Sequence, residues 1–88
     1  MSYNLKDLGI SQFETITMII TELNRRNKFG IEITNDLIKN TIDKHLKEIG
    51  ELANKEIDLV SKETTDIYFI VKNHFEIFAK NNSQQNMK

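Results

Sequence analysis

The chain has 88 residues, of which 39 % are hydrophobic and 28 % are charged, and its formal net charge is −1. These values are typical of one small globular domain with a single hydrophobic core. A net charge near zero provides no general attraction for a polyanion, so we expect no nucleic acid partner. Cysteine is absent, which excludes disulfides and thiolate metal ligands.

No apolar run reaches the roughly 20 residues that a membrane-spanning helix needs, and Met1-Ser2-Tyr3-Asn4 does not resemble the start of a signal peptide. We therefore expect a cytoplasmic protein with no membrane association. Proline is absent and glycine occurs only three times, which favours long helices. The predicted fold class is all-α, a small bundle of three to four helices. Residues 1–80 would form the domain, and the Asn- and Gln-rich residues 81–88 a flexible polar tail.

The first helix is predicted over residues 11–28. Ser11 and Glu14 have the spacing of a capping box, and Gly30 follows the helix as a stop signal. Its expected core-facing stripe consists of Phe13, Ile16, Ile20 and Leu23, widened by Met18 and Ile19. Three cations in the last turn, which complement the helix dipole, are Arg25, Arg26 and Lys28.

The second helix is predicted over residues 34–60, with Thr34 as its N-cap and Asp36 in its first turn. Apolar residues continue at helical spacing through Ile38, Ile42, Leu46, Ile49, Ala53, Ile57 and Val60. Gly50 is the weak point of this stripe, because glycine costs about 1 kcal/mol against alanine within a helix. The helix either runs through Gly50 or bends or breaks there into two shorter helices.

The third helix is predicted over residues 64–80. The run from Ile67 to Val71 is also compatible with a strand, because all of its members are β-formers. A helical stripe extends further, through His74, Phe75 and Phe78, and this favours a helix. On this stripe His74 is expected to be a core or interface histidine.

Residues 4–50 contain a pattern that resembles acyl and peptidyl carrier proteins. Their Leu-Gly-x-Asp-Ser-Leu motif aligns with Leu8-Gly9 and with Ser11, Gln12 and Phe13 in the last three positions. The Phe-Gly-Ile-Glu-Ile run that often follows their second helix is similar to residues 29–33. Further similarity lies in Asp36-Leu37-Ile38 and in Thr41-Ile42.

The resemblance implies a carrier-like helix whose start faces a partner enzyme. In such carriers the motif serine bears a phosphopantetheine arm, but glutamine at position 12 has no hydroxyl to modify. Ser11 could take the arm only if the register slipped by one residue, and an N-cap is the preferred interpretation of Ser11. We therefore expect no cofactor and no phosphopantetheine, and a non-catalytic docking module for a biosynthetic or modifying enzyme. The expected docking residues are Gln12, Phe13, Thr17, Arg25 and Arg26.

Two other functions are compatible with the sequence. One is a generic helical inhibitor, immunity or oligomerising accessory protein, including a homodimer that uses the aromatic set Tyr68, Phe69, Phe75 and Phe78. The other is a winged-helix DNA-binding protein, with residues 41–49 as recognition helix and a hairpin over residues 57–71 as wing. An enzyme is not expected, because no paired carboxylates, no nucleophile beside a base and no glycine-rich phosphate loop occur.

Overall fold

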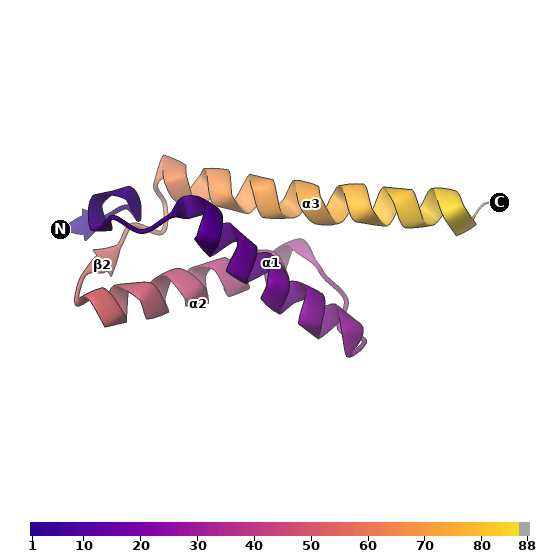
Figure 1. Cartoon of the computed structure of the whole chain (residues 1–88), viewed down its shortest axis with the longest axis horizontal. Coiled ribbons are helices and arrows are strands. Elements are labelled where there is room, and N and C mark those ends of the chain that lie inside the picture. The colour runs from indigo at the N-terminus through magenta and orange to yellow at the C-terminus, as the bar shows by residue number, and fades with distance from the viewer. Residues whose placement is uncertain (87–88) are drawn as a thin grey trace.

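A computed structural model describes the backbone of residues 1–86 and the side chains of residues 1–76. Its elements are β1 (Ser2–Tyr3), the 3-10 helix η1 (Lys6–Leu8), α1 (Gln12–Lys28), α2 (Asn35–Ala53), β2 (Glu56–Ile57) and α3 (Lys62–Asn86). The fold is predominantly helical, as predicted, and the small strand pair was not expected (Figure 1). None of the described helices is long and apolar enough to span a membrane.

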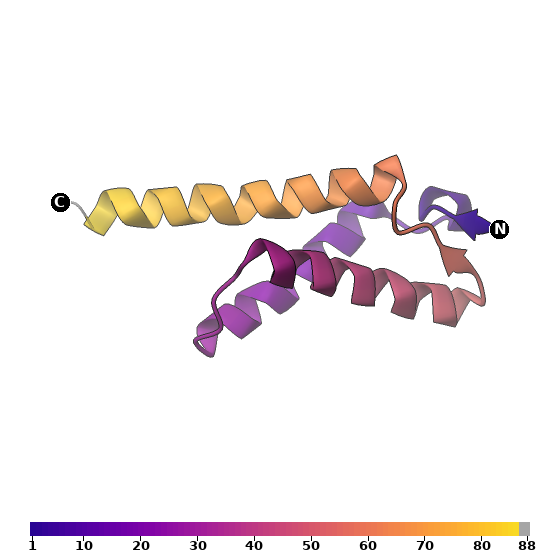
Figure 2. The ribbon, with the colours of Figure 1, turned by 180° about the vertical axis from the view of Figure 1, so that it is seen from behind.

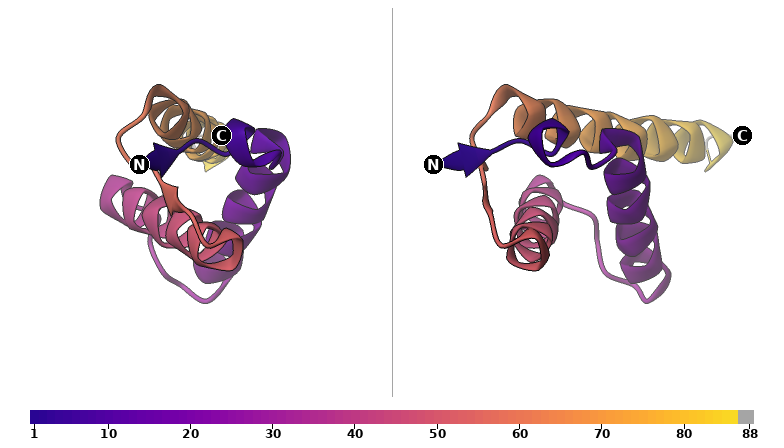
Figure 3. Two further views of the ribbon diagram at one scale, coloured as in Figure 1. Left: turned by 90° about the vertical axis from the view of Figure 1, so that its left-hand side faces the viewer. Right: turned by 60° about the vertical axis from the view of Figure 1, so that its left-hand side comes forward.

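The three α-helices surround one core, and α1 and α2 lie against the N-terminal half of α3 (Figures 1 and 3). The fully buried side chains come from all three α-helices and from the N-terminal segment: Leu5, Ile19, Leu23, Ile42, Leu46, Ile67 and Val71. The C-terminal half of α3 continues beyond α1 and α2, which gives the molecule an elongated outline of 52 × 24 × 20 Å (Figure 2).

Helix α1 begins and ends as predicted, and most of its expected core-facing stripe is confirmed, because Ile19 and Leu23 are buried and Ile16 and Ile20 pack against the core. The Ser11 hydroxyl accepts from the Glu14 N–H at 3.1 Å, which confirms the N-cap. Its buried residues are Thr15, Ile19 and Leu23, whereas Phe13 is 78 % exposed. The expected stripe was therefore wrong at Phe13 and at Met18, which is 58 % exposed. Thr15 tolerates burial because its hydroxyl donates to the Ser11 carbonyl at 2.9 Å.

Helix α2 is shorter than predicted. Thr34 caps it, accepting from the Leu37 N–H at 3.1 Å, but it ends at Ala53 and not at residue 60. Asn54 adopts a left-handed conformation (φ 54°), and the Lys55 N–H then returns to the Gly50 carbonyl at 2.9 Å. The last part of the expected stripe is therefore not helical, and Val60 is 89 % exposed.

Gly50 lies within α2, where the helix neither breaks nor divides in two. A Cβ atom at this position would lie 2.6 Å from the Lys55 carbonyl oxygen and 3.2 Å from Cγ1 of Ile57. Glycine is needed there because the chain leaving α2 folds back directly over the helix. The sequence feature that suggested a bend is thus a site of close backbone approach.

The N-terminal segment is held against the α2–α3 connection by contacts that we call the N-terminal clasp. Strands β1 and β2 pair in parallel, with Ser2 opposite Glu56 and Tyr3 opposite Ile57. The Glu63 carboxylate accepts from the backbone N–H groups of Leu5 (2.7 Å) and Lys6 (3.3 Å) at the start of η1. These bonds place the Leu5 side chain in the core.

Helix α3 begins in a compact network of hydroxyl groups. Ser61 Oγ accepts from the Thr64 N–H at 3.2 Å, and the buried Thr64 hydroxyl donates to the Asp58 carbonyl at 2.7 Å. The helix contains the ambiguous run 67–71, so its helical interpretation is confirmed and the wing of a winged-helix protein is not formed.

The later part of α3 contains His74 and the residues that were expected to form a polar tail. His74 was expected to be a core or interface histidine; it is exposed, which excludes the core position, and it stacks edge-to-face on Phe75 with ring centroids 5.1 Å apart. The helical backbone extends past the expected end at residue 80 to Asn86, so the predicted tail is helical over most of its length. Residues 87–88 and the Phe78 side chain lie outside the described part. The flexibility of the tail remains a prediction.

Candidate functional site

The residues that the carrier resemblance singles out lie at the N-terminus of α1. Ser11 uses its hydroxyl as the helix cap, and Gln12 is the first residue of the helix, half-buried. The Glu14 carboxylate makes no return bond to the Ser11 N–H among the described residues, so only half of the capping box forms. The only hydroxyl at this turn therefore already holds the helix start.

Phe13 was aligned with the carrier leucine that packs beneath the motif, but here its ring points to solvent. One and two turns further along α1, the Thr17 hydroxyl donates to the Phe13 carbonyl at 3.0 Å and the Thr21 hydroxyl to the Thr17 carbonyl at 2.8 Å. Because these hydroxyls are bonded within the helix, the threonines add methyl groups to the outer side of α1. Phe13 thus begins a weakly apolar strip along the exposed side of this helix.

A shallow groove between α1 and α2 adjoins this strip and has a volume of about 350 Å³. It is lined by Thr17, Met18, Thr21, Glu22, Arg25, Lys44, His45 and Glu48. Two of the expected docking residues, Thr17 and Arg25, therefore meet in one groove. Arg26 does not line the groove, although its guanidinium pairs at 3.4 Å with Glu22, which does. Gln12 and Arg26 lie near opposite ends of the helix.

We call the surface formed by Phe13, Thr17, Met18, Thr21 and Arg25 the α1 face. Phe13 and Met18 are its exposed large apolar side chains. Cations follow at its C-terminal end, where Arg25, Arg26 and Lys28 occupy the last turn of the helix. The α1 face can therefore offer an aromatic anchor at one end and positive charge at the other.

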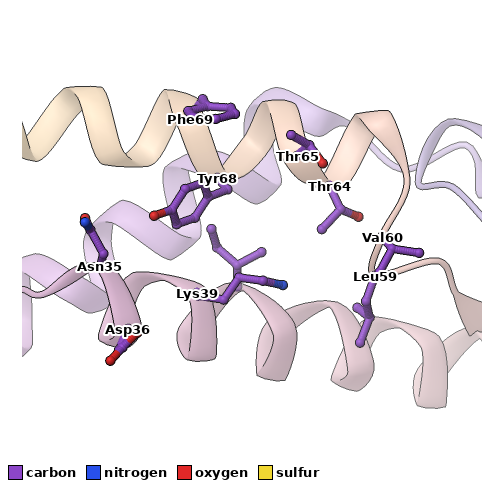
Figure 4. A pocket seen from close by; sticks show the side chains of 10 residues that line it. Asn35, Asp36, Lys39, Leu59, Val60, Thr64, Thr65, Tyr68 and Phe69 are labelled. Carbon is purple, nitrogen blue, oxygen red and sulfur yellow. The ribbon is translucent and has the colours of Figure 1, made fainter.

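A second groove, about 450 Å³ in volume, lies between α2 and the start of α3 (Figure 4). Its lining residues are Asn35, Asp36, Lys39, Ile42, Leu59, Val60, Thr64, Thr65, Tyr68 and Phe69. The groove is mainly apolar with a polar rim. The ammonium group of Lys39, one of the lining residues, is paired with Asp43 at 2.8 Å. The sequence suggested the aromatic set with Tyr68 and Phe69 as an interaction surface, but it did not predict this groove, because Val60 was assigned to a continuous helical stripe.

The described residues contain no group of three His, Cys, Asp or Glu side chains that could hold a metal ion. His45 lies half-buried in the α1–α2 groove, and His74 lies on α3. Among the described side chains, the exposed apolar groups of the α1 face and the cations at its C-terminal end are of the kinds found at protein interfaces.

Comparison with protein-family models, with curated proteins and with solved structures finds no match for this chain. The resemblance to carrier proteins therefore rests on the residues of the sequence alone.

Proposed function

We propose that this chain is a small binding module, without catalytic activity and without a phosphopantetheine arm, that docks onto a partner protein through the α1 face. The observation that carries the proposal is Phe13, whose ring is 78 % exposed although the helix behind it is well packed. Large exposed aromatic side chains beside a groove are typical anchors of protein interfaces.

The charges of α1 indicate the kind of surface that would receive it. The helix ends in Arg25, Arg26 and Lys28, and of these only Arg26 has an ion-pair partner among the described side chains. A complementary partner would present an apolar pocket for Phe13 and carboxylates toward Arg25, about three turns along the helix. Carrier helices instead present acidic residues to their enzymes, so the partner surface proposed here carries the opposite charge to that of a carrier's enzyme.

Site-specific crosslinking in the native host tests the docking surface. A photoreactive amino acid at position 13 should give one discrete adduct, and Arg25→Glu in the same chain should remove it. Leu52 provides a matched control, because it is also apolar, lies on α2 and is 90 % exposed. The proposal fails if position 13 gives no adduct, or if positions 13 and 52 give the same adducts.

The absence of an arm is tested with coenzyme A, a phosphopantetheinyl transferase and intact-mass measurement. The native chain should gain no mass, because Gln12 has no hydroxyl and the Ser11 hydroxyl caps α1. Gln12→Ser places a hydroxyl in the carrier register and should be modified if the resemblance reflects a shared recognition surface. Mass gain by the native chain would contradict the arm-free proposal, and an unmodified Gln12→Ser chain would contradict the carrier-like part of it.

A further inference from the structure

The groove between α1 and α2 brings together cations from two helices that lack carboxylate partners. Arg25 of α1 and Lys44 of α2 both line it, and both are exposed. Neither has an ion-pair partner among the described side chains, whereas each of the described ion pairs joins a cation to a carboxylate four residues away on its own helix. The two walls of the groove therefore each contribute one free positive charge.

The acidic side chains of the groove do not cancel these charges. Glu22 is paired with Arg26 at 3.4 Å, which leaves Glu48 as the one lining carboxylate without an ion-pair partner in the described part of the chain. Two unpaired cations thus meet one unpaired carboxylate, on a chain whose formal net charge is −1. The groove is locally positive, and this excess attracts an anionic ligand although the molecule as a whole does not.

Apart from its charged residues, the α1 wall of the groove offers apolar surface. The Met18 side chain is 58 % exposed, and the hydroxyls of Thr17 and Thr21 already donate to backbone carbonyls of α1. A hydroxyl has only one proton to donate, so the donors left for an anion are the two free cations and the half-buried His45. The groove therefore combines an apolar strip with positively charged donors.

We propose that this groove binds an acidic peptide segment of the partner protein, with a carboxylate held between Arg25 and Lys44 and a neighbouring apolar side chain against Met18. The inference rests on the proposed docking through the α1 face and adds the α2 wall to it. A guanidinium presents parallel N–H donors that match the two oxygens of a carboxylate, and an ammonium adds a further charge-assisted bond. A peptide can place its carboxylates clear of Glu48, whereas a nucleic acid carries a charge at every phosphate.

Fluorescence anisotropy with labelled probe peptides tests the charge preference. The probe is a capped peptide of four Leu-Glu-Glu repeats, and matched peptides of Leu-Gln-Gln and Leu-Lys-Lys repeats are the comparisons. The glutamate peptide should bind about tenfold more tightly than the glutamine peptide, because only carboxylates pair with the two cations. The lysine peptide should bind more weakly still, and random duplex DNA should compete poorly.

Single substitutions test the lining residues. Arg25→Gln and Lys44→Gln should each weaken binding of the glutamate peptide by about threefold, and Glu48→Gln should strengthen it. Lys62→Gln is the control, because it removes an exposed cation at the start of α3 that does not line the groove. It should leave the dissociation constant within about 1.5-fold at physiological ionic strength. Circular dichroism checks that each variant remains helical.

Mapped crosslinking connects the groove to the native partner. A photoreactive amino acid at position 21, an exposed position in the α1 wall, should link in the native host to a segment rich in aspartate and glutamate. Mass spectrometry of the digested adduct identifies that segment.

A glutamate peptide that binds no more tightly than the glutamine peptide overturns the proposal. Unchanged binding by Arg25→Gln and Lys44→Gln does so too, as does duplex DNA that displaces the peptide efficiently, or the lack of a link from position 21 to a carboxylate-bearing segment. An adduct at position 13 without any charge preference among the peptides would leave the docking proposal intact and remove this one, so the two failures are distinguishable.

Discussion

Replacing Gly50 by alanine separates what the structure predicts from what helix propensity predicts. Gly50 lies inside α2, and propensity alone predicts that alanine would stabilise the protein by about 1 kcal/mol. The structure predicts the opposite sign. The new Cβ would lie 2.6 Å from the Lys55 carbonyl oxygen, which is a backbone atom and cannot rotate away.

The size of the effect follows from what must move. Relieving the contact requires the segment after α2 to shift outward, which strains the bond from the Lys55 N–H to the Gly50 carbonyl and lifts Ile57, a residue only 7 % exposed. Overpacking a well-packed site costs typically about 1–3 kcal/mol. After the propensity gain is subtracted and the strained bond is included, we expect Gly50→Ala to destabilise the protein by about 1–2 kcal/mol.

Urea denaturation followed by far-UV circular dichroism measures this change. Asn40→Ala is the matched control, because Asn40 is exposed on the same helix and alanine there should stabilise by about 0.5 kcal/mol through propensity alone. A Gly50→Ala protein as stable as the native chain, or more stable, would refute the argument. It would show that the segment after α2 can shift outward without lowering the free energy of unfolding.

Substitutions at four further positions have expected outcomes in the same assay. Glu63→Ala should lower the free energy of unfolding by about 1–3 kcal/mol, since two backbone N–H groups lose their acceptor. Glu63→Gln keeps a side-chain oxygen and should lower the free energy of unfolding by less. Equal losses for the two variants would contradict this reasoning. Ser11→Ala should lower the free energy of unfolding by about 1 kcal/mol, whereas Ser11→Asp should lower it little, because aspartate also caps a helix. A Ser11→Ala protein as stable as the native chain would contradict the role of Ser11 as a stabilising cap. Phe13→Ala should change stability by no more than about 0.5 kcal/mol because the ring is exposed. Ile19→Ala, in the core, should lower the free energy of unfolding by about 2–5 kcal/mol. A comparable loss for Phe13→Ala would contradict the exposed position of the Phe13 ring.

Local signals in the sequence predicted the local structure well. The hydroxyls of Ser11 and Thr34 accept from the N–H groups three residues later, as their positions before apolar runs suggested. The stop at Gly30 is also local: its φ is 87°, and the Ile31 N–H returns to the Arg26 carbonyl at 3.1 Å. Each of these features depends only on neighbouring residues, which is why a single sequence was sufficient.

The errors arose where distant segments decide the outcome. The spacing of apolar residues predicted that the second helix continues to Val60. The helix instead ends before Asn54, whose left-handed conformation lets the chain turn back over Gly50. Hydrophobicity placed Phe13 inside, whereas packing against the other helices selected Thr15, whose hydroxyl is satisfied by the helix itself. The α1–α2 groove joins residues far apart in the chain, so only Thr17 and Arg25 from one of its walls were foreseen.

The N-terminal clasp has a consequence for the order of events during synthesis. Glu63 lies 58 positions after Leu5, the residue whose N–H it accepts, and β1 pairs with a strand that follows α2. The clasp residues that precede α1 therefore have no binding site until residues 56–63 have also left the ribosome. Helices α1 and α2 can form while Leu5 is still exposed, and the core closes only when α3 has begun. Any segment fused ahead of Ser2 would act on this last step.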